Sequence, residues 1–371
     1  MIKVGIDCRP LTMKPTGVSK YLADAIKAIH KFAPNIDMYL FSPKQFDRNT
    51  IELKGERIHV IVCPLTGLNK YIVWFNTMFV RQCIKYKIDY IWFPFPDRPL
   101  YLPRKFKTIV TVHDVVNLEY KDTQRESKIS FYRNYMTKKG IEKADYLWAN
   151  SKYTKRKIEQ YYTHRHSQEI FVAFSCSNDF HRIELSSDEI NKLKSKYGIS
   201  EKFLLFVGTL EPRKNLSFLL SVMEELHKEL PLLKLIVVGG RGWKNSDIFN
   251  IVNRDGYPKD CIEFTDYIDT DTLVKFYNMA DCYVSTALNE GFGLPQLEAM
   301  RCGCRVVTAH NSAMIEVVEG RGVTVREYDK NIWKETIIKS LNSPKPDYDL
   351  SEYDWQNVIT RLCRYLNLNN I

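Results

Sequence analysis

Short apolar runs alternate with segments of helical spacing along nearly the whole chain. Such alternation is typical of parallel sheets covered by helices, because parallel neighbours are joined through a crossover connection. In the first half we predict strands near residues 3–7, 38–42, 59–62, 90–93, 108–112 and 146–149. Helices are predicted between them at 18–32, 71–86, 127–143 and 152–162.

The second half repeats this scheme. Strands are predicted near 203–207, 234–238, 261–264, 282–285 and 305–308. A chain of 371 residues is long enough for two domains that each bury a core, so we expect two doubly wound α/β units. A polar region at 175–200 suits the linker, and 351–366 has the apolar spacing of a final helix.

The cysteines and the apolar runs indicate the compartment. Nine cysteines occur without a C-x2-C pair, which predicts reduced thiols rather than a disulfide framework or a zinc site. The N-terminal residues read as a buried strand and lack the features of a secretory signal. The longest apolar run, between Lys70 and Arg81, is about half of what a membrane span needs. We therefore expect a cytoplasmic protein that does not cross the membrane.

Charge differs between the two halves. Residues 1–180 hold 30 Lys+Arg against 17 Asp+Glu, while residues 181–371 hold 24 against 27, so the basic excess belongs to the first half. A basic face favours nucleic acid, anionic lipid or a phosphorylated acceptor. Nucleic acid is the weakest of the three, because no RNA- or DNA-binding signature accompanies the charge.

The segment EGFGLPQLE, from Glu290 to Glu298, places two carboxylates eight positions apart around a glycine turn. It follows the predicted strand at 282–285, and open α/β sheets bind ligands at the carboxyl ends of their strands. Pro295 suits the first turn of a helix, and a helix start favours anions. The structural alternative is an ordinary strand-loop-helix connection with two solvated glutamates.

This segment resembles the E-x7-E motif of the retaining glycosyltransferases of family four, which have the GT-B fold of two facing Rossmann-like domains. The run VGTLEPRKN at 207–215, His113-Asp114 after a strand and the turn around Gly17 appear in the family's order. The resemblance implies an acceptor-binding domain at 1–180, a nucleotide-sugar-binding domain at 181–346, and a helix at 347–371 that packs back on the first domain.

The resemblance also implies that Arg213 and Lys214 hold the diphosphate of the donor. Many members of the family carry an arginine directly after the glycine that ends the strand, whereas here Gly208 is followed by Thr209. We expect Arg213 to take over the role of that arginine, with Thr209 in the donor site. Two solvated surface cations are the alternative.

The glycine turn supplies the remaining donor contacts that the resemblance implies. Glu290 is expected to bond hydroxyls of the donor sugar, and Glu298 the hydroxyls of the ribose. Backbone N–H groups of the turn are expected close to the donor, and they belong to Gly291, Phe292, Gly293 and Leu294.

Three residues of the first half are expected at the site on the same grounds. His113 is expected to contact the transferred sugar, and Asp114, on the acceptor side, to orient it. Gly17 would bring backbone N–H groups near the diphosphate or the acceptor. A plain helix cap is an equal alternative for the turn at Gly17.

No cofactor or metal is expected. Asp269-Thr270-Asp271 has the D-x-D pattern of a metal-binding pair but lies where a helix is expected to start, so we interpret it as a helix cap. The glycines at 239–242 lack the G-x-G-x-x-G spacing of a nicotinamide or flavin site.

The acceptor is indicated only by composition. Residues 98–107 and the helix around Lys138 and Lys139 mix basic with aromatic or apolar side chains, which suits an anionic membrane surface or a lipid-linked sugar. A solvated basic face is the alternative.

The sequence thus predicts a metal-independent, retaining hexosyltransferase of surface-polysaccharide synthesis, peripheral on the inner face of the membrane. Mannose from a GDP-, UDP- or dTDP-linked donor would pass to a lipid-linked or oligosaccharide acceptor. A nucleotide-sugar epimerase of the same architecture and a non-catalytic sugar-nucleotide-binding protein remain the alternatives.

Overall fold

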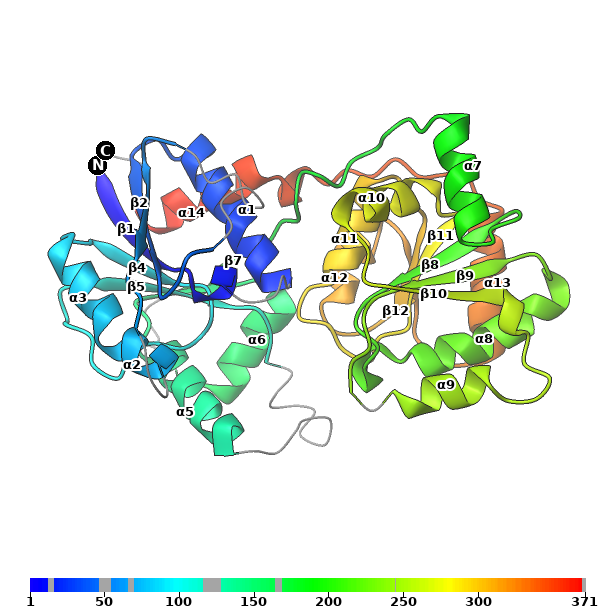
Figure 1. The fold of residues 1–371 in the computed structure, drawn as a ribbon, viewed down its shortest axis with the longest axis horizontal. Coiled ribbons are helices and arrows are strands. Elements are labelled where there is room, and N and C mark those ends of the chain that lie inside the picture. The colour runs from blue at the N-terminus through cyan, green and yellow to red at the C-terminus, as the bar shows by residue number, and fades with distance from the viewer. Residues whose placement is uncertain are drawn as a thin grey trace. The chain divides into compact units, whose positions relative to one another are not determined.

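The computed structural model describes residues 1–12, 17–46, 55–65, 70–115, 128–163, 169–243 and 245–368, with only the backbone at 70 and 128–133. They form two compact units. The first takes in the described residues up to Ser175 and those from Ser351 onward, and the second is Cys176–Leu350. In Figure 1 the first unit is blue to blue-green with a red final helix, and the second is green to orange. The divisions at 175/176 and 350/351 lie near the expected 180/181 and 346/347.

The sheet of the first unit is parallel throughout, with strand order β3-β2-β1-β4-β5-β6-β7. Most residues of its central strands are buried, as is typical of a sheet covered on both faces. The order reverses between β1 and β4, which are neighbours. The strands are β1 (Ile2–Asp7), β2 (Ile36–Ser42), β3 (Ile58–Val62), β4 (Tyr90–Phe93), β5 (Lys107–Val112), β6 (Tyr146–Ala149) and β7 (Phe171–Val172).

Helices precede and follow these strands. They are η1 (Arg9–Thr12), α1 (Gly17–Phe32), α2 (Lys70–Asn76), α3 (Met78–Lys85), α5 (Lys128–Glu142), α6 (Lys152–Tyr161), η5 (Ser351–Tyr353) and α14 (Trp355–Tyr365). The final helix, α14, contacts α1, and the ring of Trp355 lies 5.5 Å from that of Tyr21. Arg361 and Tyr365 of α14 donate hydrogen bonds to the carbonyl oxygens of Val172 and Glu169. These contacts hold the end of the chain within the first unit.

The second unit has a six-stranded parallel sheet of order β10-β9-β8-β11-β12-β13. Its strands are β8 (Phe203–Val207), β9 (Lys234–Val238), β10 (Ile262–Asp266), β11 (Cys282–Ser285), β12 (Val306–Ala309) and β13 (Val323–Val325). Its helices are α7 (Ser187–Lys196), η3 (Pro212–Lys214), α8 (Leu216–Glu229), α9 (Ser246–Val252), η4 (Lys259–Cys261), α10 (Thr270–Met279), α11 (Leu294–Arg301), α12 (Met314–Val318) and α13 (Lys330–Leu341).

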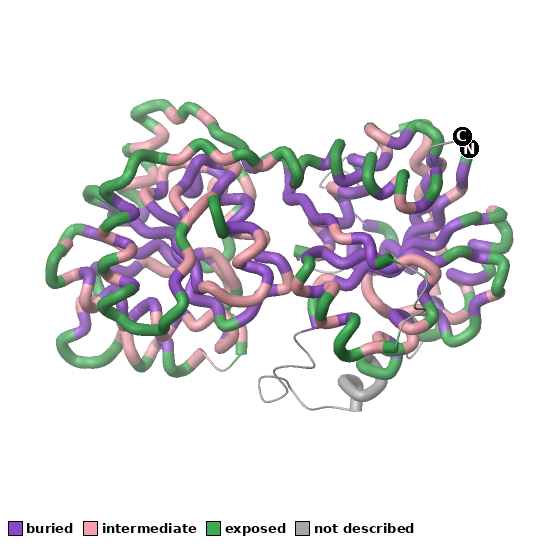
Figure 2. The backbone as a smooth tube through the Cα atoms, turned by 180° about the vertical axis from the view of Figure 1, so that it is seen from behind, coloured by how far each residue is buried: buried purple, intermediate pink, exposed green. Residues whose placement is uncertain are grey.

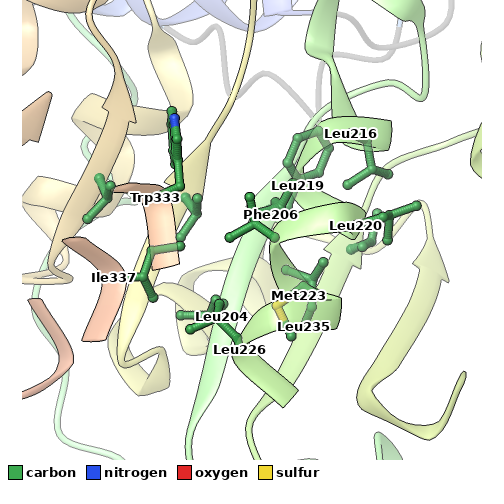
Figure 3. Packing of buried hydrophobic residues seen from close by; sticks show 14 of the residues in the cluster. Leu204, Phe206, Leu216, Leu219, Leu220, Met223, Leu226, Leu235, Trp333 and Ile337 are labelled. Atoms are coloured by element: carbon green, nitrogen blue, oxygen red, sulfur yellow. The ribbon is translucent and has the colours of Figure 1, made fainter. Parts of the chain in front are cut away.

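Each unit buries its own core. Figure 2 shows buried segments gathered in the middle of each unit, with exposed segments around them. In the second unit, α8 and α13 pack on the central strands, and Figure 3 shows Met223 of α8 and Trp333 of α13 in the same buried cluster as Phe206 of β8. Fully burying one such side chain stabilises the fold by about 1.5 to 3 kcal/mol. The predicted pair of parallel α/β units is confirmed.

Most predicted elements agree with the structure, with three differences. The helix predicted at 71–86 is two helices, α2 and α3, which meet at Thr77. The Thr77 hydroxyl donates to the Val73 carbonyl at 2.7 Å, a bond that bends or interrupts helices. The strands β7 and β13 were not predicted, because two or three residues are too few for a periodic pattern. The strand predicted at 261–264 lies at Ile262–Asp266.

The turn after β9 packs closely on the turn after β8. A Cβ atom on Gly239 would overlap the carbonyl group of Gly208, and Gly239 has a φ of +149°. The next residue, Gly240, has nothing within 4 Å of the position of a Cβ atom. The two adjacent glycines therefore form a matched pair for a stability test.

We expect Gly239→Ala to destabilise the protein by more than about 1 kcal/mol, since both the dihedral angle and the close carbonyl oppose a side chain. Gly240→Ala should stay within about 0.5 kcal/mol of the wild type. Thermal unfolding followed by calorimetry measures both. Equal midpoints for the two variants would show that the close approach is absent.

Candidate functional site

A cluster of two buried carboxylates and two half-buried cations lies at the carboxyl end of β8. Arg213 Nη1 donates to the Asn289 carbonyl at 2.7 Å and to Glu290 Oε2 at 2.8 Å. Its Nη2 pairs with Glu211 Oε1 at 2.6 Å. Lys214 Nζ pairs with the other carboxylate oxygen of Glu290, Oε1. The first glutamate of the E-x7-E segment therefore holds both of the cations that the sequence analysis singled out.

The local backbone explains how the two cations reach this position. Asn215 adopts the left-handed conformation, at φ 51° and ψ 37°, and joins η3 to α8. A Cβ atom on Gly208 would lie only 3.1 Å from Lys214 Cε, so the glycine leaves room for the lysine stem. The Leu288 N–H donates to the Arg213 carbonyl at 2.8 Å. This bond ties the loop after β8 to the loop after β11.

The charges of the cluster sum to zero, because two carboxylates face two cations. Glu290 is only 8% exposed, and burial by itself would raise the pKa of its carboxyl group. The charges of Lys214 and Arg213, with their hydrogen bonds, outweigh burial and hold that pKa below its ordinary value. Glu290 is therefore an ionised hydrogen-bond acceptor near neutral pH.

Glu211 was missed by the sequence analysis. It is buried and pairs with Arg213, so neither cation stands free in this state of the protein. The only signal in the sequence was its place directly before Pro212, within the run EPRK.

The glycine turn lies at the carboxyl end of β11. Gly293, at φ 101° and ψ 53°, immediately precedes α11, which begins at Leu294, so that Pro295 lies in its first turn as predicted. The Glu290 N–H donates to Ser312 Oγ at 2.9 Å, and the Glu290 carbonyl accepts from the Ala313 N–H at 3.3 Å. The turn is thus anchored to the loop after β12. Of its other expected residues, Phe292 is buried and Gly291 is half-buried.

The second glutamate, Glu298, lies on α11 and is buried. The Tyr277 hydroxyl, from α10, donates to Glu298 Oε2 at 3.0 Å. Burial raises the pKa of Tyr277 well above its usual range, so this phenol keeps its proton. Tyr277 was also missed, since a tyrosine at helical spacing cannot be told from a core aromatic in the sequence.

His113, in the first unit, directly follows β5. Its Nε2 lies 2.9 Å from the Pro94 carbonyl oxygen, and because a carbonyl only accepts, Nε2 carries the proton. Burial lowers the pKa of His113 to about 4, against an opposing effect of that bond. His113 is therefore a neutral imidazole whose Nδ1 is an acceptor. The predicted orienting residue, Asp114, is exposed.

Two further residues expected at the site, Gly17 and Thr209, are exposed. Gly17 is exposed at the start of α1, where a Cβ atom would have nothing within 4 Å. Thr209 is exposed in the turn after β8. Asp269 caps α10 by accepting from the Thr272 N–H at 2.8 Å, which confirms the interpretation of that segment as a helix cap.

Among the residues that the structure describes, no group of three or more His, Cys, Asp or Glu side chains could hold a metal ion. No helix among the same residues is long and apolar enough to span a bilayer. Independence of metals stays a prediction.

Two family models match the chain one after the other. Residues 15–171 match "Glycosyltransferase Family 4", and residues 189–355 match "Glycosyl transferases group 1". The chain belongs to this glycosyltransferase family. The match runs through both units and includes every candidate residue from Gly17 to Glu298.

Similar glycosyltransferases include two mannosyltransferases of Escherichia coli. The O-antigen chain mannosyltransferase B of Escherichia coli is 25% identical over 377 residues, covering 97% of this chain and 98% of that protein. The serotype-specific mannosyltransferase WbdA of Escherichia coli is 27% identical over 241 residues, or 64% of this chain. That match spans only 29% of the length of WbdA.

Solved structures share the fold at low identity. HepE from Anabaena, in complex with UDP-glucose, has a TM-score of 0.73 at 16% identity and is covered over 100% of its length by 99% of this chain. Sucrose-phosphate synthase from Thermosynechococcus elongatus has a TM-score of 0.72 at 17% identity, with 99% of both chains covered. The predicted GT-B fold of this glycosyltransferase is confirmed.

The pairing of Glu290 predicts a pH-dependent stability. A carboxyl group with a lowered pKa in the folded state stabilises the protein above its ordinary pKa and stops doing so as the pH falls through the folded-state value. At pH 7 we expect Glu290→Gln to be less stable than the wild type by about 1.5 to 3 kcal/mol. This gap should begin to narrow below about pH 4.3 and close at lower pH.

Calorimetric unfolding between pH 7 and pH 3 measures the gap. The exposed Glu201 provides the matched control, since Glu201→Gln should follow the wild type at every pH. A gap that stays constant down to pH 3 would mean that Glu290 is not held by the two cations.

Proposed function

We propose that this chain is a retaining glycosyltransferase that moves mannose from a nucleoside-diphosphate donor to a hydroxyl group of a glycan or lipid-linked acceptor. The carrying observation is the cluster of Arg213, Lys214 and Glu290 beside the start of α11. The choice of mannose is supported by the two mannosyltransferase relatives. The choice of a nucleoside-diphosphate donor is supported by the UDP-glucose complex of HepE.

The proposed reaction breaks the bond between the anomeric carbon and the diphosphate, whose oxygen keeps the electron pair. The acceptor oxygen forms the new bond on the same face of the sugar, and its proton passes to the departing diphosphate. Negative charge therefore develops on the diphosphate, where Lys214, Arg213 and the N-terminus of α11 supply positive potential. No metal ion takes part in this proposal.

The neutral cluster suits a donor that carries both an anion and hydroxyl groups. Without a ligand, Lys214 and Glu290 satisfy one another. Phosphate oxygens that bind Lys214 and sugar hydroxyls that bind Glu290 would replace this pair by two new ones. Each buried charge then keeps a partner, which is the condition for burying it at acceptable cost.

The cluster can supply only part of the lowering of the activation free energy. Each charge-assisted hydrogen bond is worth about 1.5 to 3 kcal/mol, and a favourable helix terminus up to about 2 kcal/mol. Two cations and one helix start therefore sum to about 5 to 8 kcal/mol, at or below the bottom of the range of about 8 to 23 kcal/mol that enzymes supply. Alignment of donor and acceptor, worth up to about 7 to 11 kcal/mol, must provide much of the rest.

We propose that His113 positions the sugar. A pKa of about 4 makes it a neutral group near pH 7, so it is not a general acid there. Its proton is held by the Pro94 carbonyl, and Nδ1 can accept a hydrogen bond from a sugar hydroxyl.

For the acceptor we propose a lipid-linked glycan at an anionic membrane surface. The first unit exposes Leu100 and, to 75%, Tyr101, between the basic residues Arg98 and Arg104. The Leu100 N–H donates to Asn76 Oδ1 at 2.7 Å, which fixes this segment beside α2. Exposed apolar side chains among cations suit an interface of anionic lipid.

Incubation with GDP-, UDP- and dTDP-sugars, with and without membrane extract, tests the activity. We expect sugar transfer with one donor, only when acceptor is present. Conversion of the donor without acceptor would instead indicate an epimerase, and nucleotide binding without release from the sugar would indicate a binding protein.

We expect Lys214→Ala and Glu290→Ala to lower transfer by at least about 100-fold, because each removes a group that faces charge or hydroxyls of the donor. Both variants should remain folded by circular dichroism. Lys334→Ala is the control, since Lys334 pairs with Glu229 on the surface. Wild-type turnover in the Lys214 and Glu290 variants would refute the proposed site.

Tyr277 should act as a positioning residue for Glu298. Tyr277→Phe removes the hydrogen bond that orients the carboxylate, so we expect about tenfold weaker binding of a ribonucleoside diphosphate, as loss of one bond to a charged group implies. Binding of the 2′-deoxyribose analogue should change less.

Tyr257→Phe is the matched control for this measurement. Its hydroxyl is also buried and donates to the Leu220 carbonyl at 2.8 Å, but not to a residue of the candidate site. In calorimetric titration, Tyr257→Phe should bind the ribonucleoside diphosphate and its 2′-deoxyribose analogue with the same ratio of affinities as the wild type. An unchanged ratio in Tyr277→Phe as well would exclude the positioning role.

A further inference from the structure

Gln296 is a buried glutamine with no assigned role. It is the third residue of α11 and only 1% exposed. In the described part of the chain, neither atom of its side-chain amide has a hydrogen-bond partner. A carboxamide has two donor hydrogens and two acceptor lone pairs, and burying them unpaired costs free energy that an apolar side chain of similar size would not.

The amide is turned back toward the start of the helix. A Cβ atom on Gly293 would lie 2.9 Å from Gln296 Oε1 and 3.4 Å from Nε2. Helical side chains lean toward the N-terminus, so this direction is the expected one. A glutamine at this position often bonds the backbone N–H of the capping residue, but Gln296 makes no such bond.

The start of α11 itself has no side-chain cap. Gly293 has no side chain to offer, and Pro295 contributes no N–H group. The helix start is thus an electropositive end beside the pair of Glu290 and Lys214. Two independent observations, an uncapped helix start and an unsatisfied amide aimed at it, coincide at one place.

We propose that Gln296 binds the donor. Its amide nitrogen donates a hydrogen bond to a phosphate oxygen of the nucleoside diphosphate at the start of α11, either directly or through one ordered water. This inference rests on the proposed function and adds a residue that selects for the diphosphate. A neutral carboxamide can donate to an anion, whereas a carboxylate of the same shape would repel it.

A structural role would have a different signature. If a buried water satisfied the amide in the free protein, Gln296 would contribute to stability and not to nucleotide affinity. If the amide is satisfied by the ligand, its removal leaves the free protein as stable as before or more so, while binding weakens. Stability and affinity then change in opposite directions.

The test uses Gln296→Leu and Gln296→Glu in the full chain, with GDP, UDP, dTDP and the corresponding nucleosides as probes. We expect Gln296→Leu to melt at or above the wild-type temperature without ligand. Its Kd for the nucleoside diphosphate should rise about tenfold, the value of one hydrogen bond to a charged group. Affinity for the nucleoside should not change.

Gln296→Glu should weaken diphosphate binding more than the leucine variant does, since it adds a negative charge near the phosphates. It also serves as the second readout should the leucine variant fold poorly. The matched control is Thr308→Val in β12, where another fully buried side chain has an unpartnered hydroxyl among the described residues. This control should keep the wild-type affinity.

The outcomes distinguish failure of the role of Gln296 from failure of the proposed function. Diphosphate binding by the wild type with an unchanged Kd in Gln296→Leu overturns the role of Gln296 and leaves the proposed function intact. A lower melting temperature with unchanged affinity assigns the amide to a buried water and overturns the role as well. Failure of the wild type to bind GDP, UDP and dTDP overturns the proposed function together with this inference.

Discussion

The second unit depends on the salt bridges from Arg213 and Lys214 to Glu290. These groups are largely buried, and a buried charge is tolerated only when it has partners in good geometry. The same contacts hold two loops together, because Arg213 bonds the Asn289 carbonyl and accepts from the Leu288 N–H. The ends of β8 and β11 are therefore fixed in relation to one another. The glycine turn and α11, which follow β11 in the chain, are positioned by this contact between the two loops.

Pairing also determines what a ligand must offer. Because the two cations already face two carboxylates, a simple anion that binds Lys214 would have to separate it from Glu290 and leave this buried carboxylate with Arg213 as its remaining charged partner. Removing one partner of a buried ion pair costs up to about 3 to 5 kcal/mol. A ligand that brings hydroxyl groups next to its anion avoids that cost. The pairing of Glu290 with Lys214 therefore favours a sugar phosphate over free phosphate.

The sequence predicted the strands well because buried parallel strands are short apolar runs, such as Phe203–Val207, and these runs stand out between helices. It also singled out Glu290 and Lys214 from their positions near glycines, and the structure pairs the two side chains, while their roles in binding a donor stay predictions. Tyr277 and Glu298 could not be paired in advance, since 21 residues separate them and only the packing of α10 on α11 brings them together. Glu211 was missed for the same reason: its burial depends on Arg213, and burial is a property of the fold.

Several buried polar groups gather at one edge of the second unit, whereas most of its core is apolar. Glu211, Glu290, Gln296 and Glu298 are all buried near the carboxyl ends of β8 and β11, while the cluster around Leu204 and Val284 contains only apolar and aromatic side chains and cysteines. A fold selected for stability alone would place apolar residues at this edge too. Ion pairs lower the free-energy cost of burying Glu211 and Glu290. Gln296, by contrast, has a buried side-chain amide without a hydrogen-bond partner among the described residues. This amide lies beside the helix start where an anion is stabilised most, which is why the unsatisfied amide indicates a ligand contact.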